Sequence, residues 1–338
     1  MSLSDRRRGV ALLVVLLAAV LGGCSSASPA SSVAPTPSES ASQAAASPSP
    51  SPTPAFPVSL TDDEGTPVEL PAEPKKVVSL TPATTEILFA LGAGDRVVAT
   101  DDGSDHPDQA ASLPDVATFS SVDVEKVVAL SPDLVVAGGL GFTPAESITK
   151  LRDLKIPVVV IYAPSVEGVL KDIELLGSAT GTSAKAESVT SAMRADMAAV
   201  SSAVAGQSPK PRVFYDVGYD DTTGAIYAPA DDSFLAEMVT MAGGDAITTG
   251  DPNSYEIPLE KLIEKDPQLI VLGTNPFYSP TPDAVAKRRG WDAFSAVRNG
   301  DIKAVNDIEI TRPGPRLPMG LRTLAGAIWP DVTLPAAS

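Results

Sequence analysis

Short apolar runs alternate with amphipathic helical segments along most of the chain. The runs that predict buried strands are 75–80, 97–99, 134–136, 212–217 and 302–305. A helix is predicted to begin at Thr81, with Pro82 in its first turn, and to end at Gly92. Residues 56–70 have the pattern of a hairpin that turns near Gly65. This alternation predicts an α/β fold with mainly parallel sheets.

An internal repeat indicates how these elements are divided. Residues 122–136 and 257–271 are identical at five of fifteen positions, and five more positions exchange one aliphatic residue for another. Each copy predicts a short helix led by a glutamate, a proline that ends it, and a buried strand. Two such copies predict two similar α/β lobes.

A long amphipathic helix is predicted between the two copies. Apolar residues recur at helical spacing across 183–205, and we expect Thr182 or Ser183 to cap this helix. Its length of about 33 Å is enough to join two lobes as one stiff connector. The predicted boundaries are 57–164 for the N-terminal lobe, 165–208 for the connecting helical segment and 209–338 for the C-terminal lobe.

The N-terminus has the pattern of an export signal. Arginines at 6–8 precede an uncharged apolar run at 10–21, which is about half the length of a membrane-spanning helix. Leu21-Gly22-Gly23-Cys24 follows and resembles a bacterial lipobox, in which the cysteine thiol carries diacylglycerol. An ordinary signal peptide with an incidental cysteine is the alternative. We therefore predict a signal peptide at 1–23, lipidation of Cys24, and a secreted protein anchored by lipid to the outer face of the cell membrane.

Composition and charge set further limits. Residues 24–56 are mostly Ser, Ala, Pro and Thr, which predicts a disordered tether. Cys24 is the only cysteine, so the folded part has no disulfide, no cysteine metal ligand and no cysteine nucleophile. The formal net charge of −17 argues against nucleic acid as a partner.

Several segments, in this order, carry a resemblance to one family: 77–88, 104–107, 130–135, 259–262 and 311–317. Over roughly 57–332 the chain resembles the iron-chelate and cobalamin class of periplasmic binding proteins of ABC importers. The resemblance implies a monomer with two lobes joined by one rigid helix. It implies a metal-chelate ligand: cobalamin or another corrinoid, haem, or a ferric siderophore. The ligand itself brings the iron or cobalt, so no cofactor is expected. Few basic residues occur in the candidate loops, which favours a corrinoid over strongly anionic iron complexes.

Other classes of function fit the residues less well. Enzyme chemistry of the Ser-His-Asp kind would depend on His106, the single histidine, and no nucleophile elbow or phosphate-binding loop accompanies it. A zinc or manganese site needs several imidazoles, which one histidine cannot supply. His106 as a lone ligand of a chelated metal and His106 as an exposed loop residue both stay open. An adhesion protein would explain the anchor but not the duplicated lobes. We expect no catalytic residue and no metal site of the protein's own.

The ligand contacts are expected in the loops that follow the strands, because ligands bind at the carboxyl ends of parallel sheets. Large flat ligands are held by aromatic side chains and a few polar groups. The candidate contacts are Thr81, Asp102, Phe119, Phe142, Tyr219, Tyr255, Phe277, Tyr278, Asp307 and Arg312. For each aromatic residue, core packing or loop anchoring is the alternative. Arg312 matches a family position whose arginine often reaches the ligand, whereas Arg316 and Trp291 are expected to be structural.

Glu125 and Glu260 occupy the same position in the two copies of the repeat. In the family that the chain resembles, a glutamate on each lobe pairs with arginines of the permease dimer. A twofold-symmetric dimer also requires equivalent patches on the two lobes. The alternative is that each glutamate only stabilises the N-terminus of its own helix. The expected partners are the chelate, an ABC permease dimer with its ATPase, and the membrane through the lipid anchor.

Overall fold

The computed structural model describes residues 56–139, 141–276 and 278–336. The predicted signal peptide, Cys24 and nearly all of the tether lie outside these ranges. The described residues belong to one unit of the chain, 49–338, so the predicted lobe boundaries within it stay predictions. Within the described ranges, no helix is both long enough and apolar enough to cross a membrane.

The N-terminal lobe is built on a six-stranded sheet with the order β6-β5-β4-β3-β7-β8. Its strands are β3 (Val77–Ser79), β4 (Val97–Asp101), β5 (Asp115–Thr118), β6 (Ser121–Val122), β7 (Leu134–Gly138) and β8 (Val158–Ile161). Neighbouring strands are parallel except for β5 and β6. The strands β3, β7 and β8 are buried along their whole length, as expected for a parallel sheet covered on both faces.

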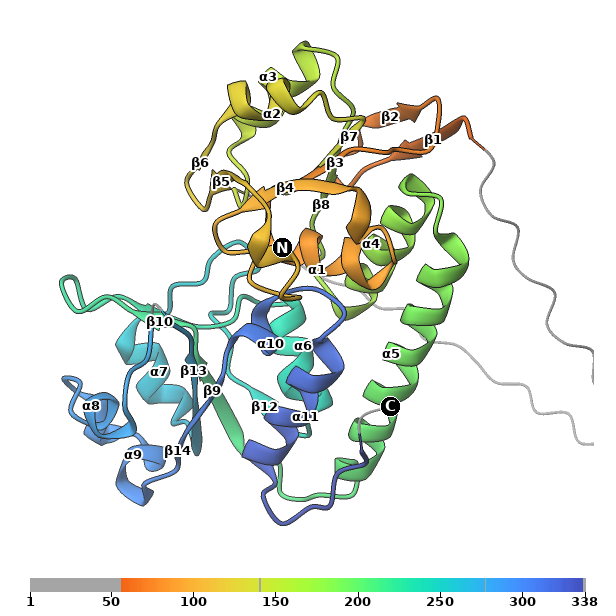
Figure 1. Cartoon of the computed structure of the whole chain (residues 1–338). Coiled ribbons are helices and arrows are strands. Elements are labelled where there is room, and N and C mark those ends of the chain that lie inside the picture. The colour runs from red at the N-terminus through yellow and green to blue at the C-terminus, as the bar shows by residue number, and fades with distance from the viewer. Residues whose placement is uncertain (1–55, 140, 277, 337–338) are drawn as a thin grey trace, which may run out of the picture. The chain divides into compact units, whose positions relative to one another are not determined.

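Helices cover both faces of this sheet (Figure 1). They are α1 (Pro82–Ala90), α2 (Val124–Leu130), α3 (Ala145–Asp153) and α4 (Val166–Ala179), with short 3-10 turns η1 (Gly94–Arg96) and η2 (Ala110–Ser112). Apolar residues of α2 and α3 pack on one face, and those of α1 and α4 on the other. The predicted hairpin is confirmed as β1 (Val58–Thr61) paired with β2 (Pro67–Leu70).

The C-terminal lobe has a smaller, entirely parallel sheet with the order β12-β9-β13-β14. Its strands are β9 (Arg212–Asp216), β12 (Asp245–Ala246), β13 (Leu269–Thr274) and β14 (Ile302–Asn306), and a small hairpin is formed by β10 (Gly218–Tyr219) and β11 (Ile226–Tyr227). Its helices are α6 (Phe234–Met241), α7 (Leu259–Lys265), α8 (Pro282–Ala286), η3 (Trp291–Ala293), α9 (Ser295–Asn299), α10 (Ile308–Thr311) and α11 (Leu317–Ile328). Trp291 packs against Phe214 and Phe294 in the core, which confirms its structural role.

The predicted connecting helix is confirmed as α5 (Ser183–Val204). It packs against α4 and α11 and runs beside both lobes in Figure 1. The apolar cluster on its buried side includes residues of both sheets, so the lobes share one continuous core. The predicted side-chain cap of this helix is wrong. Thr182 stands at the N-cap position, but its hydroxyl pairs with that of Thr180 at 2.8 Å and makes no capping bond to the helix.

The sequence repeat corresponds to a structural repeat, α2–β7 in one lobe and α7–β13 in the other. In each copy, the residue before the proline ends the helix in the left-handed region, with φ 49° at Ser131 and 41° at Asp266. The residue after the proline, Asp133 or Gln268, accepts a main-chain hydrogen bond at the start of the neighbouring strand, β3 or β9, at 2.9 or 3.0 Å. The helix–proline–strand unit is therefore built in the same way in the two lobes.

Candidate functional site

The carboxyl ends of the two sheets face each other. Arg312, after β14, donates from Nη1 to Oδ1 of Asp105, in the loop after β4, at 2.7 Å. Tyr162, after β8, lies beside Tyr255 of the C-terminal lobe, and the pKa of Tyr162 is raised by its burial and by Tyr255. Loops that are far apart in the sequence therefore meet where parallel α/β sheets bind their ligands.

Two exposed phenylalanines form an aromatic surface on the N-terminal lobe. The exposed fraction is 75% for Phe119, after β5, and 51% for Phe142, after β7. Their rings meet edge to face with centroids 6.4 Å apart. Gly138 leaves room for Phe142 at this position. A Cβ atom on residue 138 would lie within 3.0 Å of both Thr81 and Phe142, which is closer than ordinary van der Waals contact. Large apolar side chains left exposed in a loop are typical of a binding surface.

Thr81 takes part in a network of buried hydroxyls at the start of α1. Its Oγ1 accepts from the backbone N–H of Thr84 at 3.4 Å, and the Thr84 hydroxyl pairs with that of Ser79 at 2.6 Å. Through Thr85 and Ser104 the network continues to the carboxylate of Asp101. Burial raises the pKa of Asp101 despite the hydrogen bond from Ser104. The hydroxyl of Thr81 is thus engaged in holding the first turn of α1.

Arg288, which is largely buried, joins the loops at the carboxyl end of β9. The guanidinium of Arg288 lies 4.2 Å from the ring centroid of Tyr219 and 4.6 Å from that of Trp291. It donates at 2.7 Å to Asp216 Oδ2 and at 2.7 Å to the hydroxyl of Tyr278. Burial and the Asp216 carboxylate raise the pKa of Tyr278 to about 12. Arg288 therefore stacks on the rings of Tyr219 and Trp291, and its charge is neutralised within the protein by Asp216.

Asp307 is held just after β14 by two side chains of neighbouring strands and loops. Its Oδ1 accepts from the hydroxyl of Tyr215 at 2.6 Å, and its Oδ2 accepts from Nδ2 of Asn275 at 3.3 Å. Burial and the Asp307 charge raise the pKa of Tyr215 well above its usual value. Gly273 is needed beside this pair, because a Cβ atom there would overlap the Asp307 carboxylate and would lie 2.8 Å from the Tyr215 hydroxyl.

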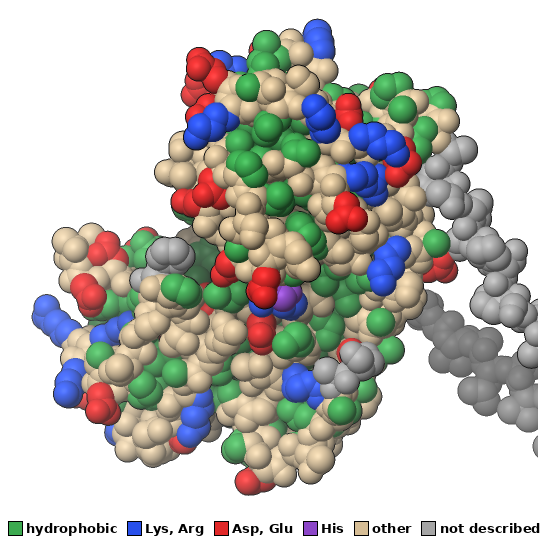
Figure 2. Space-filling view, in the orientation of Figure 1, with side chains coloured by type: hydrophobic (Ala, Val, Ile, Leu, Met, Phe, Trp, Pro, Cys, Tyr) green, Lys and Arg blue, Asp and Glu red, His purple; other side chains and the backbone are tan. Residues whose placement is uncertain are grey.

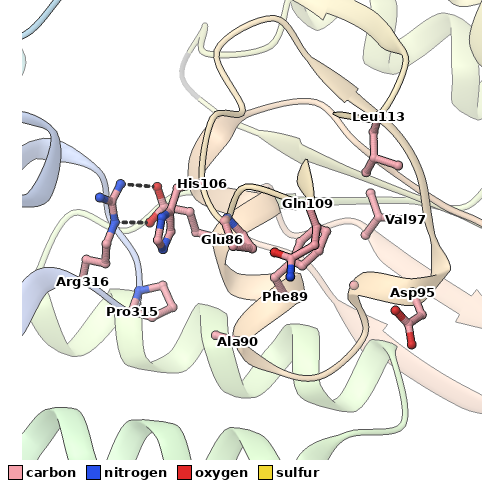
Figure 3. A pocket seen from close by; sticks show the side chains of 12 residues that line it. Glu86, Phe89, Ala90, Asp95, Val97, His106, Gln109, Leu113, Pro315 and Arg316 are labelled. Atoms are coloured by element: carbon pink, nitrogen blue, oxygen red, sulfur yellow. Dashed lines mark hydrogen bonds and ion pairs between the residues drawn. The ribbon is translucent and has the colours of Figure 1, made fainter. Parts of the chain in front are cut away.

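Two arginines of the C-terminal lobe bind one buried glutamate of the N-terminal lobe. Arg316 donates to both carboxylate oxygens of Glu86, at 2.9 and 2.5 Å, and this pair is drawn in Figure 3. Arg312 donates from Nη1 to Oε1 of Glu86 at 3.0 Å. The side chain of Glu86, on α1, is 3% exposed. The two lobes are thus joined by a partly buried ion cluster in addition to α5.

A depression of about 610 Å³ lies next to this ion cluster, and its lining includes His106, Phe89 and Leu113 (Figure 3). It contains none of the predicted ligand contacts that the structure describes. His106 is exposed and lies among acidic and basic side chains in Figure 2. Within the described ranges, no group of three or more His, Cys, Asp or Glu residues could hold a metal ion.

Most of the predicted contacts lie in the loops that follow the strands of the two sheets. Asp102 is exposed, Tyr255 is 43% exposed, and Phe277 lies outside the described residues. The sequence did not point to Tyr162, Glu86 or Arg288, whereas Asp105 and Asp216 lie in the strand-end segments 101–106 and 215–219, where the ligand contacts are expected. Tyr162 follows the buried run 158–161, so the strand-end rule could have found it. The pairing of these carboxylates with distant arginines had no signal in the sequence.

Glu125 and Glu260 lie where the repeat predicts. Each is exposed and stands in the first turn of its helix, α2 or α7. Glu125 borders a depression of about 390 Å³, whose lining also includes Pro144 and Lys150. Both carboxylates are accessible to a partner.

Comparison with known proteins identifies the class of this protein. A family model described as periplasmic binding protein matches residues 77–308. The chain therefore belongs to the periplasmic binding protein family. It is an extracytoplasmic substrate-binding protein of the ABC-transporter class, which is a class of binding proteins and not of enzymes.

Individual relatives cover nearly all of the folded part. The substrate-binding lipoprotein YvrC of Bacillus subtilis is 32% identical over 280 residues, 82% of this chain and 87% of that protein. A cobalamin-binding protein of Halobacterium salinarum is 30% identical over 335 residues, 95% of this chain and 85% of that protein. The structure of the vitamin B12-binding protein BtuF of Vibrio cholerae matches with a TM-score of 0.64 at 25% identity, over 75% of this chain and 96% of BtuF. The haem-binding protein RhuT of Roseiflexus matches with a TM-score of 0.67 at 24% identity, over 76% and 98% of the chains, and supports the fold alone.

Proposed function

We propose that this protein captures cobalamin or another corrinoid outside the cell and delivers it to an ABC permease. The choice of a corrinoid rests on one observation: the arginines of the facing loops are already neutralised by carboxylates of the protein. Arg288 and Arg312, the arginines at the predicted contacts, are both paired with carboxylates of the protein. Such a surface offers little to a strongly anionic ligand and suits a large ligand whose rim is made of uncharged amides.

The aromatic side chains of the facing loops support the same choice. Phe119 and Phe142 present apolar surface from the N-terminal lobe, and Tyr255 does so from the C-terminal lobe. A corrin ring has two broad faces that such side chains can cover. The relative from Halobacterium salinarum is named a cobalamin-binding protein, and relatives from Vibrio and Pectobacterium are named vitamin B12-binding proteins. These names favour a corrinoid over the other chelates that the class serves.

The test is a titration of the purified soluble protein with cyanocobalamin, haemin and a panel of ferric siderophores, followed by intrinsic fluorescence. Trp291 lies under Tyr219 and beside Arg288, so a ligand on these loops should change its emission. We expect saturable quenching by cyanocobalamin. Tight binding of a ferric siderophore or haemin without a response to cobalamin would contradict the choice of ligand. Failure of every chelate to bind would contradict the proposed function.

Delivery requires an anchor and a docking surface. Lipidation of Cys24 would hold the protein at the outer face of the membrane on the 24–56 tether, and the Bacillus subtilis relative is itself named a lipoprotein. Glu125 and Glu260 would meet arginines on the two permease subunits, because both are exposed at equivalent positions of the two lobes.

A further inference from the structure

The donors of Arg312 are shared between two carboxylates of very different accessibility. Nη1 donates to Glu86 at 3.0 Å and to Asp105 at 2.7 Å, and Nη2 donates to the carbonyl of Gly103 at 3.3 Å. The Glu86 side chain is 3% exposed and is also held by Arg316, whereas the Asp105 side chain is 57% exposed. Glu86 is therefore the buried partner of Arg312, and Asp105 is its exposed partner.

Asp105 is well suited to accept the hydrogen bond from Nη1 of Arg312 at neutral pH. Partial burial raises the pKa of Asp105, but the hydrogen bond and the charge of Arg312 outweigh this effect, so the pKa lies below its usual value. The carboxylate is thus ionised at neutral pH. Its loop, between β4 and η2, also carries Asp102, one of the predicted ligand contacts.

We propose that Asp105 determines specificity by occupying the donor of Arg312 that a carboxylate of an anionic ligand would otherwise use. This inference rests on the proposed function, because it concerns which chelates the facing loops accept. A ligand carboxylate must displace Asp105 or approach beside it. Displacement exchanges one charged hydrogen bond for another with no net gain, and approach brings two like charges together. A ligand with an amide rim meets neither penalty.

The test compares ligands that differ in carboxylates alone. Haemin carries two propionates, and its dimethyl ester has the same ring without these charges. In Asp105→Asn, the affinity for haemin should rise about tenfold, because a charged hydrogen bond to Arg312 becomes available. The affinities for the dimethyl ester and for cyanocobalamin should stay within about twofold of wild type, since neither ligand brings a carboxylate to the arginine.

Two controls separate this mechanism from a general effect of charge. Asp108→Asn removes the same charge from an exposed neighbour on the same loop, and it should leave the affinity for haemin unchanged. Adding Arg312→Gln to Asp105→Asn should abolish the gain. Asp105→Ser is a second variant with the same expectation, and urea unfolding checks that each variant is folded.

The outcomes distinguish this inference from the proposed function. A wild-type protein that binds cyanocobalamin, together with an unchanged haemin affinity in both Asp105 variants, would overturn the role of Asp105 alone. An equal gain in Asp108→Asn, or a gain that survives the loss of Arg312, would also overturn it. A wild-type protein that binds none of these chelates would overturn the proposed function and this inference with it.

Discussion

The ion cluster of Glu86 with Arg312 and Arg316 is expected to stabilise the contact between the two lobes. Replacing Glu86 with Gln removes one charge but keeps the length and shape of the side chain. Three hydrogen bonds from Arg312 and Arg316 then lose their ionic partner at a site where the glutamate is 3% exposed. Removing one partner of a fully buried pair costs about 3–5 kcal/mol. The two arginines are 19% and 17% exposed, so we expect a smaller loss of about 2 kcal/mol in the free energy of unfolding.

Urea unfolding of the soluble protein, followed by circular dichroism, measures this loss. Glu64→Gln is the matched control, because Glu64 also pairs with an arginine, Arg152, but its side chain is 39% exposed. Glu64→Gln should cost about 0.5 kcal/mol or less. Equal losses in the two variants would refute the reasoning, since the Glu86 cluster would then contribute no more than an exposed ion pair.

Four further expectations concern the anchor, the docking surface, one buried carboxyl group and the connecting helix. Cys24→Ser should release a longer, soluble precursor from the membrane fraction, and unchanged processing and attachment would contradict lipidation. Reversing Glu125 and Glu260 to Arg should reduce uptake, most in the double variant, without changing ligand affinity; uptake that survives would exclude them as docking residues. Burial and Asp63 raise the pKa of Asp172 from 3.8 to about 9. The folded state therefore binds the Asp172 proton more tightly than the unfolded state, and the free energy of unfolding should fall as pH rises from about 4 to about 9. Asp172→Asn should flatten this pH dependence, and an unchanged slope in the variant would contradict the expectation. Because α5 contains no Pro or Gly break, X-ray scattering profiles with and without ligand should nearly overlay, and a large compaction would contradict a stiff connector.

Local patterns in the sequence predicted most of the fold. The helix after β3 begins at Thr81 because a side-chain cap and a proline act within one turn. The repeat predicted equivalent helix–proline–strand units, which the left-handed Ser131 and Asp266 end in the same way. The spacing of apolar residues predicted α5. These features depend on neighbours along the chain, so a single sequence carries them.

The partners of the charged residues could not be predicted in this way. Glu86 and Arg312 are 226 positions apart, and Asp216 and Arg288 are 72 apart. Such pairs depend on how the sheets and loops come together, and no local pattern encodes that. The sequence therefore indicated few basic residues at the ligand loops, but only the structure revealed that the arginines present are already neutralised.

In the proposed function, the facing loops bind a corrinoid through the aromatic surface of Phe119 and Phe142. Titration calorimetry with cyanocobalamin, on the wild-type protein and on a Phe119→Ser, Phe142→Ser double variant, tests it most directly. Both rings are exposed, so the variant should stay folded. We expect one equivalent of cobalamin to bind the wild type, and the variant to lose about 2 kcal/mol, roughly thirtyfold in affinity, with the apolar contact. Equal affinities for the two proteins, or no binding by the wild type, would contradict the claim.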